Sequence, residues 1–75
     1  MSGRPKKRSL TLKGHRTSVS LEDEFWDAFL EISRNKSIGI NALANVIDAE
    51  RGADAGLASA IRVYVLNHYR GVSDR

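Results

Sequence analysis

The short segment of residues 16–21, Arg-Thr-Ser-Val-Ser-Leu, constrains the fold of this chain more than any other feature. Polar side chains alternate in it with apolar or β-branched ones, which is the period-2 pattern of a strand with one buried face. A strand this short is not stable alone, because its backbone groups need partners. No comparable strand follows it. Its partner is therefore either residues 9–13, folded back around Lys13-Gly14, or the same strand of a second chain.

The size of the chain favours association with a second copy. A chain of 75 residues forms one domain, and a domain this small buries only about 60% of its unfolded surface. There is no cysteine to form disulfides or thiolate-bound metal sites, and His15 and His68 are too far apart in sequence for a local metal motif. We therefore expect a homodimer without a metal or a cofactor.

Three helices are expected after the strand. Residues 22–35 combine apolar side chains at helical spacing with acidic residues at the start, where they suit the positive end of the helix dipole. Similar spacing predicts a second helix over about residues 40–50 and a third over about residues 55–70. Gly71 is well placed as a left-handed cap. The expected fold is mainly α with one short N-terminal β-strand.

Positive charge is concentrated at the N-terminus. Residues 1–21 carry six basic residues and no acidic one, whereas the rest of the chain carries six basic and nine acidic residues. A basic segment on a weakly acidic body is typical of a protein whose N-terminus contacts the phosphates of nucleic acid. Residues 1–8 contain Gly, Pro and clustered like charges, so they are expected to be a disordered basic arm. Residues 72–75 are expected to be a frayed tail.

Membrane and enzymatic functions are disfavoured. No apolar run approaches the ~20 residues of a transmembrane helix, and no apolar segment of a secretory signal follows the basic N-terminus, so a cytoplasmic location is expected. His15 and Asp23, with Ser18 or Ser20, invite a catalytic triad, but neighbouring strand residues alternate sides and the chain is too small to enclose a substrate pocket. The sequence contains no nucleotide-binding loop, metalloprotease or hydrolase motif. The protein is therefore not expected to be an enzyme.

The order of basic arm, strand, helix, turn and helix resembles the ribbon-helix-helix family, the Arc and MetJ class of DNA-binding proteins. Particular segments also resemble a group of short bacterial members of this family. These segments are Lys-Arg-Ser-Leu-Thr-Leu at 7–12, the run at 14–22, Phe25-Trp26, Asn41-Ala42-Leu43 and residues 59–66. The resemblance extends over about residues 7–70. It implies a ribbon-helix-helix domain over residues 9–71 that forms an intertwined dimer. The third helix is then an addition to the minimal unit, or else residues 38–52 are an insertion.

The resemblance also implies a function and a set of contacts. Two strands paired across the dimer axis would enter the major groove of DNA, where Arg16, Ser18 and Ser20 face the base edges. The function would be site-specific DNA binding and transcriptional repression. Phosphates would be contacted by Lys6, Lys7, Arg8, Lys13 and His15, and at the start of the second helix by Gly39 and Asn41. The core shared by the two chains would contain Val19, Leu21, Phe25, Phe29, Ile32, Leu43 and Ile47.

Two alternatives remain open from the sequence. One is a monomeric helix-turn-helix protein that reads DNA through Ser59, Arg62 and Asn67 of the third helix; otherwise Arg62 is expected to face solvent. The other is a protein-interaction module, an antitoxin or adaptor, with a protein partner bound on helix 55–70. A folded monomer would favour the first alternative, and a dimer that is indifferent to DNA would favour the second.

Overall fold

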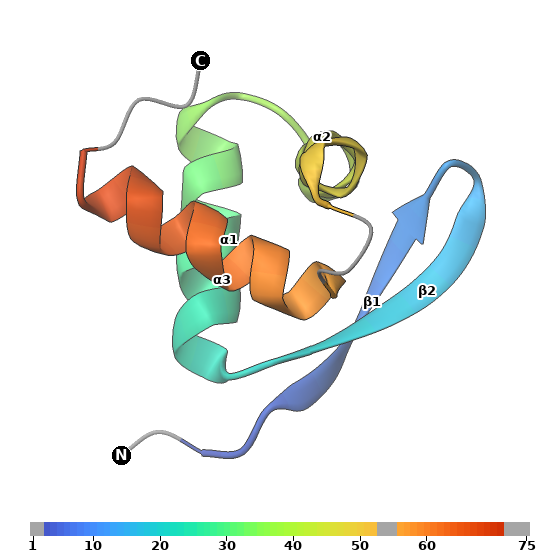
Figure 1. Ribbon diagram of the computed structural model, residues 1–75, viewed down its shortest axis with the longest axis horizontal. Coiled ribbons are helices and arrows are strands. Elements are labelled where there is room, and N and C mark those ends of the chain that lie inside the picture. The colour runs from blue at the N-terminus through green and yellow to red at the C-terminus, as the bar shows by residue number, and fades with distance from the viewer. Residues whose placement is uncertain (1–2, 53–55, 72–75) are drawn as a thin grey trace.

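A computed structural model of the chain describes residues 3–52 and 56–71. It contains a two-stranded hairpin followed by three helices (Figure 1): β1 (Lys6–Leu12), β2 (His15–Leu21), α1 (Asp23–Asn35), α2 (Ile40–Glu50) and α3 (Leu57–Tyr69). The three helices expected from hydrophobic periodicity are thereby confirmed. The expectation of one N-terminal strand is corrected, because the described chain has two. The frayed tail expected at 72–75 lies outside the described residues.

The first strand pairs with the second within one chain. The antiparallel register runs from Lys6 opposite Leu21 to Leu12 opposite His15. Lys13 and Gly14 connect the strands with φ angles of 52° and 79°. Positive φ at both central residues defines a type I′ turn, whose twist matches that of the flanking strands. Of the two possible partners for the second strand, the chain's own preceding segment is the one observed.

The basic residues 6–8 belong to β1 and not to a disordered arm, which corrects the expectation for that part of residues 1–8. Composition suggested disorder because clustered like charges cannot be buried together. In the folded chain the backbone of these residues is paired with β2. The side chains of Lys6 and Arg8 are also compensated by Asp23 at the start of α1.

The core lies between the inner face of the hairpin and the three helices. In Figure 1, α3 crosses α1, and the hairpin runs along one side of the helices with its tip near α2. Six of the seven residues expected in a shared dimer core are buried within this single chain; Phe25 is only partly buried. Ile61 and Val65 bring α3 into the same core. The buried apolar residues are Leu10, Val19, Leu21, Phe29, Ile32, Leu43, Ala44, Ile47, Ile61 and Val65.

The helix ends follow local backbone chemistry. Gly71 has a φ of 78° after the end of α3, which confirms it as the left-handed cap. At the end of α1 the same conformation is adopted by Ser37, with a φ of 58°. Gly39 is the N-cap of α2 and offers no side chain to the first helical turn. No helix in the described ranges is long and apolar enough to cross a membrane.

Candidate nucleic-acid interface

The outer face of the hairpin carries one continuous polar surface. Opposite residues of an antiparallel pair lie on the same face of the sheet. Because Leu10, Val19 and Leu21 point into the core, the intervening residues of both strands point away from it. This outer row consists of three cross-strand pairs: Lys7 with Ser20, Ser9 with Ser18, and Thr11 with Arg16. It contains two cations, four hydroxyl groups and no carboxylate.

Four of the six residues in this row were predicted from the sequence, with Lys7 as a phosphate contact and the three residues of β2 as base contacts. Arg16, Ser18 and Ser20 are exposed on β2 as expected. Ser9 and Thr11 were not named as candidate contacts, although residues 9–13 were one of the two possible partners of the second strand. The alternation of Ser9 and Thr11 with Leu10 and Leu12 is the signal that places them on the outer face once this segment pairs with β2.

The two long edges of the hairpin differ, because α2 covers the edge of β1 near the hairpin tip. The N–H of Thr11 donates to Asn41 Oδ1 at 2.9 Å, and the N–H of Lys13 donates to Asn45 Oδ1 at 3.0 Å. Asn45 also donates from Nδ2 to the carbonyl of Thr11 at 3.4 Å. Two amide side chains one helical turn apart therefore satisfy the backbone groups that β1 presents near the hairpin tip, at Thr11 and Lys13. For the edge groups of Lys7 and Ser9, farther from the tip, no hydrogen-bond partner occurs among the described residues.

The outer edge of β2 is open over most of its length. Since Thr11 turns its backbone groups away from β2, its cross-strand partner Arg16 turns its own away from β1, and so do Ser18 and Ser20. The carbonyl of Ser20 accepts a hydrogen bond from Arg62 Nη2 at 3.3 Å. For the backbone groups of Arg16 and Ser18 on this edge, no hydrogen-bond partner occurs among the residues that the structure describes. The edge of β2 can therefore accept another strand.

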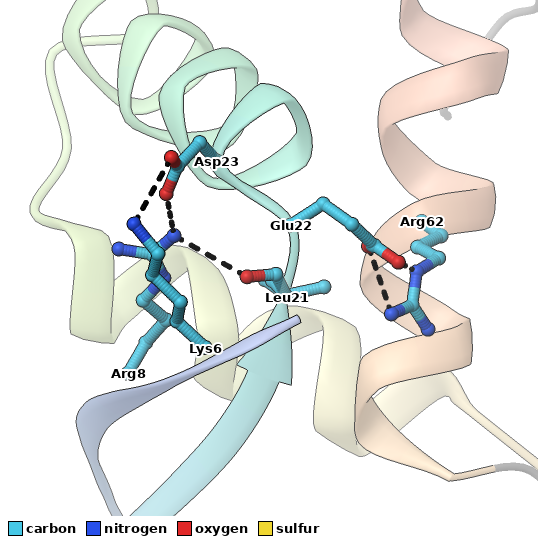
Figure 2. A network of polar contacts seen from close by, with 6 residues as sticks. All are labelled: Lys6, Arg8, Leu21, Glu22, Asp23 and Arg62. Atoms are coloured by element: carbon cyan, nitrogen blue, oxygen red, sulfur yellow. Dashed lines mark hydrogen bonds and ion pairs between the residues drawn. The ribbon is translucent and has the colours of Figure 1, made fainter. Parts of the chain in front are cut away.

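Two of the expected phosphate contacts, Lys6 and Arg8, occupy inner-face positions of the hairpin and are ion-paired with Asp23, although the side chain of Lys6 stays 60% exposed (Figure 2). Lys6 Nζ lies 3.2 Å from Asp23 Oδ2, and Arg8 Nη2 binds Asp23 Oδ1 and donates to the carbonyl of Leu21 at 3.3 Å. The guanidinium of Arg8 lies 5.5 Å from the ring centroid of Trp26. Hydrogen bonds from Arg8 and then from Lys6 hold the pKa of Asp23 below its ordinary value. The inward cations thus join β1 to the start of α1.

A second ion pair joins α3 to the end of β2 (Figure 2). Arg62 donates from Nε at 3.1 Å and from Nη2 at 2.9 Å to Glu22 Oε1. Its guanidinium also lies 5.7 Å from the ring centroid of Phe25. The pKa of Glu22 is lowered, first by a hydrogen bond with its own backbone and then by Arg62. Arg62 was expected to face solvent. In the structure it binds Glu22, the residue between β2 and α1, and so connects α3 to this junction.

The remaining expected phosphate contacts lie at the hairpin tip and at the start of α2. Lys13 lies within the tight turn and His15 directly after it, and both are exposed. Gly39 and Asn41 are exposed at the first turn of α2, which lies beside β1 through the bond between Asn41 and Thr11. The side-chain oxygen of Asn41 is thus already engaged within the fold. Among the described residues, no cluster of histidine and acidic side chains could hold a metal ion.

Comparison with known proteins agrees with this architecture. The family model described as a ribbon-helix-helix domain matches residues 5–69, a range that contains both strands and all three helices. Comparisons with curated proteins and with solved structures gave no match. Because the matched range includes α3, this helix falls within the domain that the family model covers. The chain belongs to the ribbon-helix-helix domain family.

Proposed function

We propose that this protein is a sequence-specific DNA-binding protein that acts as a transcriptional repressor and binds the major groove as a homodimer. A ribbon-helix-helix domain implies a DNA-binding protein of the repressor-like or antitoxin type. Members of the family are generally non-catalytic and typically bind DNA as dimers. The observation that carries the proposal is the exposed row of Arg16, Ser18 and Ser20, which lies on a face without a carboxylate.

The open edge of β2 supports a dimer formed by strand pairing. In this dimer, β2 lies antiparallel to β2 of a second copy, and the free backbone groups of Arg16 and Ser18 supply hydrogen bonds across the axis. Asn41 and Asn45 occupy the edge of β1 at Thr11 and Lys13, next to the hairpin tip, which favours pairing through β2. The two central strands then form a ribbon of the width that the major groove admits.

The chemistry of the row suits base recognition. Arg16 can donate two hydrogen bonds to O6 and N7 of guanine, and Ser18 and Ser20 can donate to or accept from several base edges. A good bidentate contact discriminates against the wrong base by about 1–3 kcal/mol. Lys13 and His15 at the tip, and the backbone N–H groups at the start of α2, are suited to phosphates.

The test combines oligomeric state with base preference. Duplexes selected from a random pool are titrated with the wild type and with an Arg16→Ala/Ser18→Ala variant at two salt concentrations, and both proteins are sedimented without DNA. We expect two dimers, of which only the wild type prefers the selected duplex over a scrambled one. A wild type that is monomeric, or that ignores all duplexes at low salt, would contradict the proposal.

The contacts of α3 argue against a monomeric helix-turn-helix reader. That mechanism needs Arg62 and Asn67 to reach base edges. Arg62 is instead bonded to Glu22 and to the carbonyl of Ser20, and Asn67 is partly buried where it lines a groove between α2 and α3. Substituting Ser18 separates the two mechanisms, because a reader on α3 would tolerate Ser18→Ala without loss of base preference.

A protein-interaction role on α3 is the second candidate. Val63, Leu66 and Tyr69 are each more than half exposed, with fractions of 55%, 52% and 55%. Apolar side chains in this number on one helix are more typical of a contact surface than of solvent-facing positions. This role would be favoured if the dimer did not bind DNA at low salt. It would be disfavoured if a Leu66→Ser variant formed the same dimer, bound the operator equally well and functioned like the wild type in cells.

A further inference from the structure

The proposed dimer contains four strands rather than two, and this determines what β1 can contact. We propose that β1 binds the phosphate backbone on each wall of the major groove through Lys7, Ser9 and Thr11, while β2 reads the bases. This inference rests on the proposed function and deepens it, because it assigns a DNA contact to a strand that lies outside the minimal unit of one strand and two helices.

The width of the sheet carries the argument. Neighbouring strands lie about 4.8 Å apart, so four strands with β2 in the centre span roughly 14 Å between the two β1 backbones. The major groove is about 12 Å wide. A sheet centred in the groove therefore places its two central strands over the bases and its two outer strands over the sugar-phosphate walls. The register of the hairpin identifies the residues over each part of the groove. On β1, the residues over the groove walls are Lys7, Ser9 and Thr11. Their cross-strand partners over the bases are Ser20, Ser18 and Arg16.

The chemistry of β1 fits phosphates. Its outer row provides an ammonium group and two hydroxyl groups, all of which can donate hydrogen bonds to phosphate oxygens. Lys7 and Ser9 are exposed and Thr11 partly so. Lys7 has no ion-pair partner among the residues that the structure describes, in contrast to Lys6, whose ammonium is 3.2 Å from Asp23 Oδ2. The free charge on β1 is thus on the face that would meet DNA.

The edge contacts with α2 hold β1 in the required place. Asn41 and Asn45 occupy the backbone groups of Thr11 and Lys13. These bonds hold the part of β1 near the hairpin tip against α2, so the outer row there stays at a fixed distance from the dimer axis. The hydrogen bonds from α2 therefore set the spacing between the two rows that would contact opposite groove walls.

The salt dependence of binding tests this assignment. Lys7→Gln and the matched control Lys6→Gln remove the same charge from adjacent residues of one strand, and only Lys7 faces outward unpaired. Affinities for the selected and for a scrambled duplex are measured against salt concentration. Since each phosphate contact contributes a slope of about 0.9, Lys7→Gln is expected to lower the slope by about 2 per dimer. Lys6→Gln is expected to lower it by clearly less.

The hydroxyl groups are tested by Ser9→Ala/Thr11→Val, with thermal unfolding to verify that the variant is folded. We expect a several-fold loss of affinity that is equal on the selected and the scrambled duplex. If this variant or Lys7→Gln changed base preference, β1 would lie over the bases and the inference would be overturned. Equal salt slopes for Lys7→Gln and Lys6→Gln would overturn it as well. Both of these outcomes leave DNA binding intact, whereas failure of the proposed function itself appears as a wild type that binds neither duplex.

Discussion

Ser37 directly follows the C-cap of α1 and adopts the left-handed backbone conformation. Its φ is 58°. The N–H of Ser37 donates to the carbonyl of Arg34 and the N–H of Ile38 donates to the carbonyl of Ser33, each at 3.0 Å. These two bonds form a Schellman motif, in which glycine is the usual residue. A residue with a Cβ atom costs about 1–2 kcal/mol in this conformation, so the native chain carries local strain here.

Ser37→Gly is therefore expected to raise the free energy of unfolding by about 0.5–1 kcal/mol, after allowance for the greater freedom of glycine in the unfolded chain. Urea denaturation measures the change. The control is Asn35→Gly in the last turn of α1, where φ is helical and the substitution is expected to give no gain. Equal changes for the two variants would contradict the strain argument.

Asp23 links pH to stability through its contacts with Lys6 and Arg8. Its folded pKa lies below the ordinary value of 3.8, with the hydrogen bond from Arg8 as the largest cause. Because the pKa is lower in the folded state, the stabilisation is complete at neutral pH. It is lost as the pH falls below about 3.8 and through the folded pKa.

Asp23→Asn is thus expected to be less stable than the wild type at pH 7, and the gap is expected to close in acid. Melting temperatures of both proteins from pH 7 to pH 2 measure this convergence. High salt should narrow the gap at pH 7, since these ion pairs are partly exposed. A gap that stayed constant down to pH 2 would show that the carboxylate charge has no role.

At the scale of elements, the contact between α2 and β1 depends on two amides with i, i+4 spacing. Asn41 and Asn45 reach across to backbone groups thirty and more residues away in sequence. Asn41→Ala/Asn45→Ala leaves the N–H groups of Thr11 and Lys13 without these partners. Since a hydrogen bond contributes about 0.5–1.5 kcal/mol, we expect the free energy of unfolding to fall by about 1–3 kcal/mol.

Hydrogen exchange localises the effect of the Asn41→Ala/Asn45→Ala variant. The amides of Thr11 and Lys13 are expected to exchange faster, whereas that of Leu10, which lies within the hairpin ladder, is expected to change less. Uniform acceleration over the whole hairpin would instead indicate that the two amides support the fold generally.

At the scale of the whole molecule, the position of the open edge predicts how two copies associate. Ser18→Pro removes an N–H from the edge of β2, and Ser9→Pro removes one from the edge of β1, directly opposite in the hairpin. Neither N–H belongs to the ladder between the two strands, so proline is compatible with both positions. We expect Ser18→Pro to sediment as a folded monomer and Ser9→Pro to remain a dimer. Two dimers would exclude pairing through β2.

Local patterns in the sequence were sufficient to predict the three helices, the strand at residues 16–21, its outer row and the glycine cap at Gly71. These features depend on side-chain periodicity and backbone conformation, which act over a few residues. The residues of β1 were only partly predictable, because Lys6 and Arg8 occupy the inward positions where apolar side chains are expected.

Those inward charges are tolerated because Asp23 lies beside them in the folded chain, more than ten residues along the sequence. Arg62 shows the same dependence over a longer distance, since Glu22 is 40 residues away from it. Packing also placed Asn41 and Asn45 against the edge of β1 near the hairpin tip, whereas the edge groups of Arg16 and Ser18 on β2 have no partner among the described residues. The sequence alone determined the three helices, the strand at residues 16–21 and the faces that they bury, through short-range periodicity. Only the tertiary structure decided which charges are paired and which edge is free, because these properties arise between residues that folding brings together.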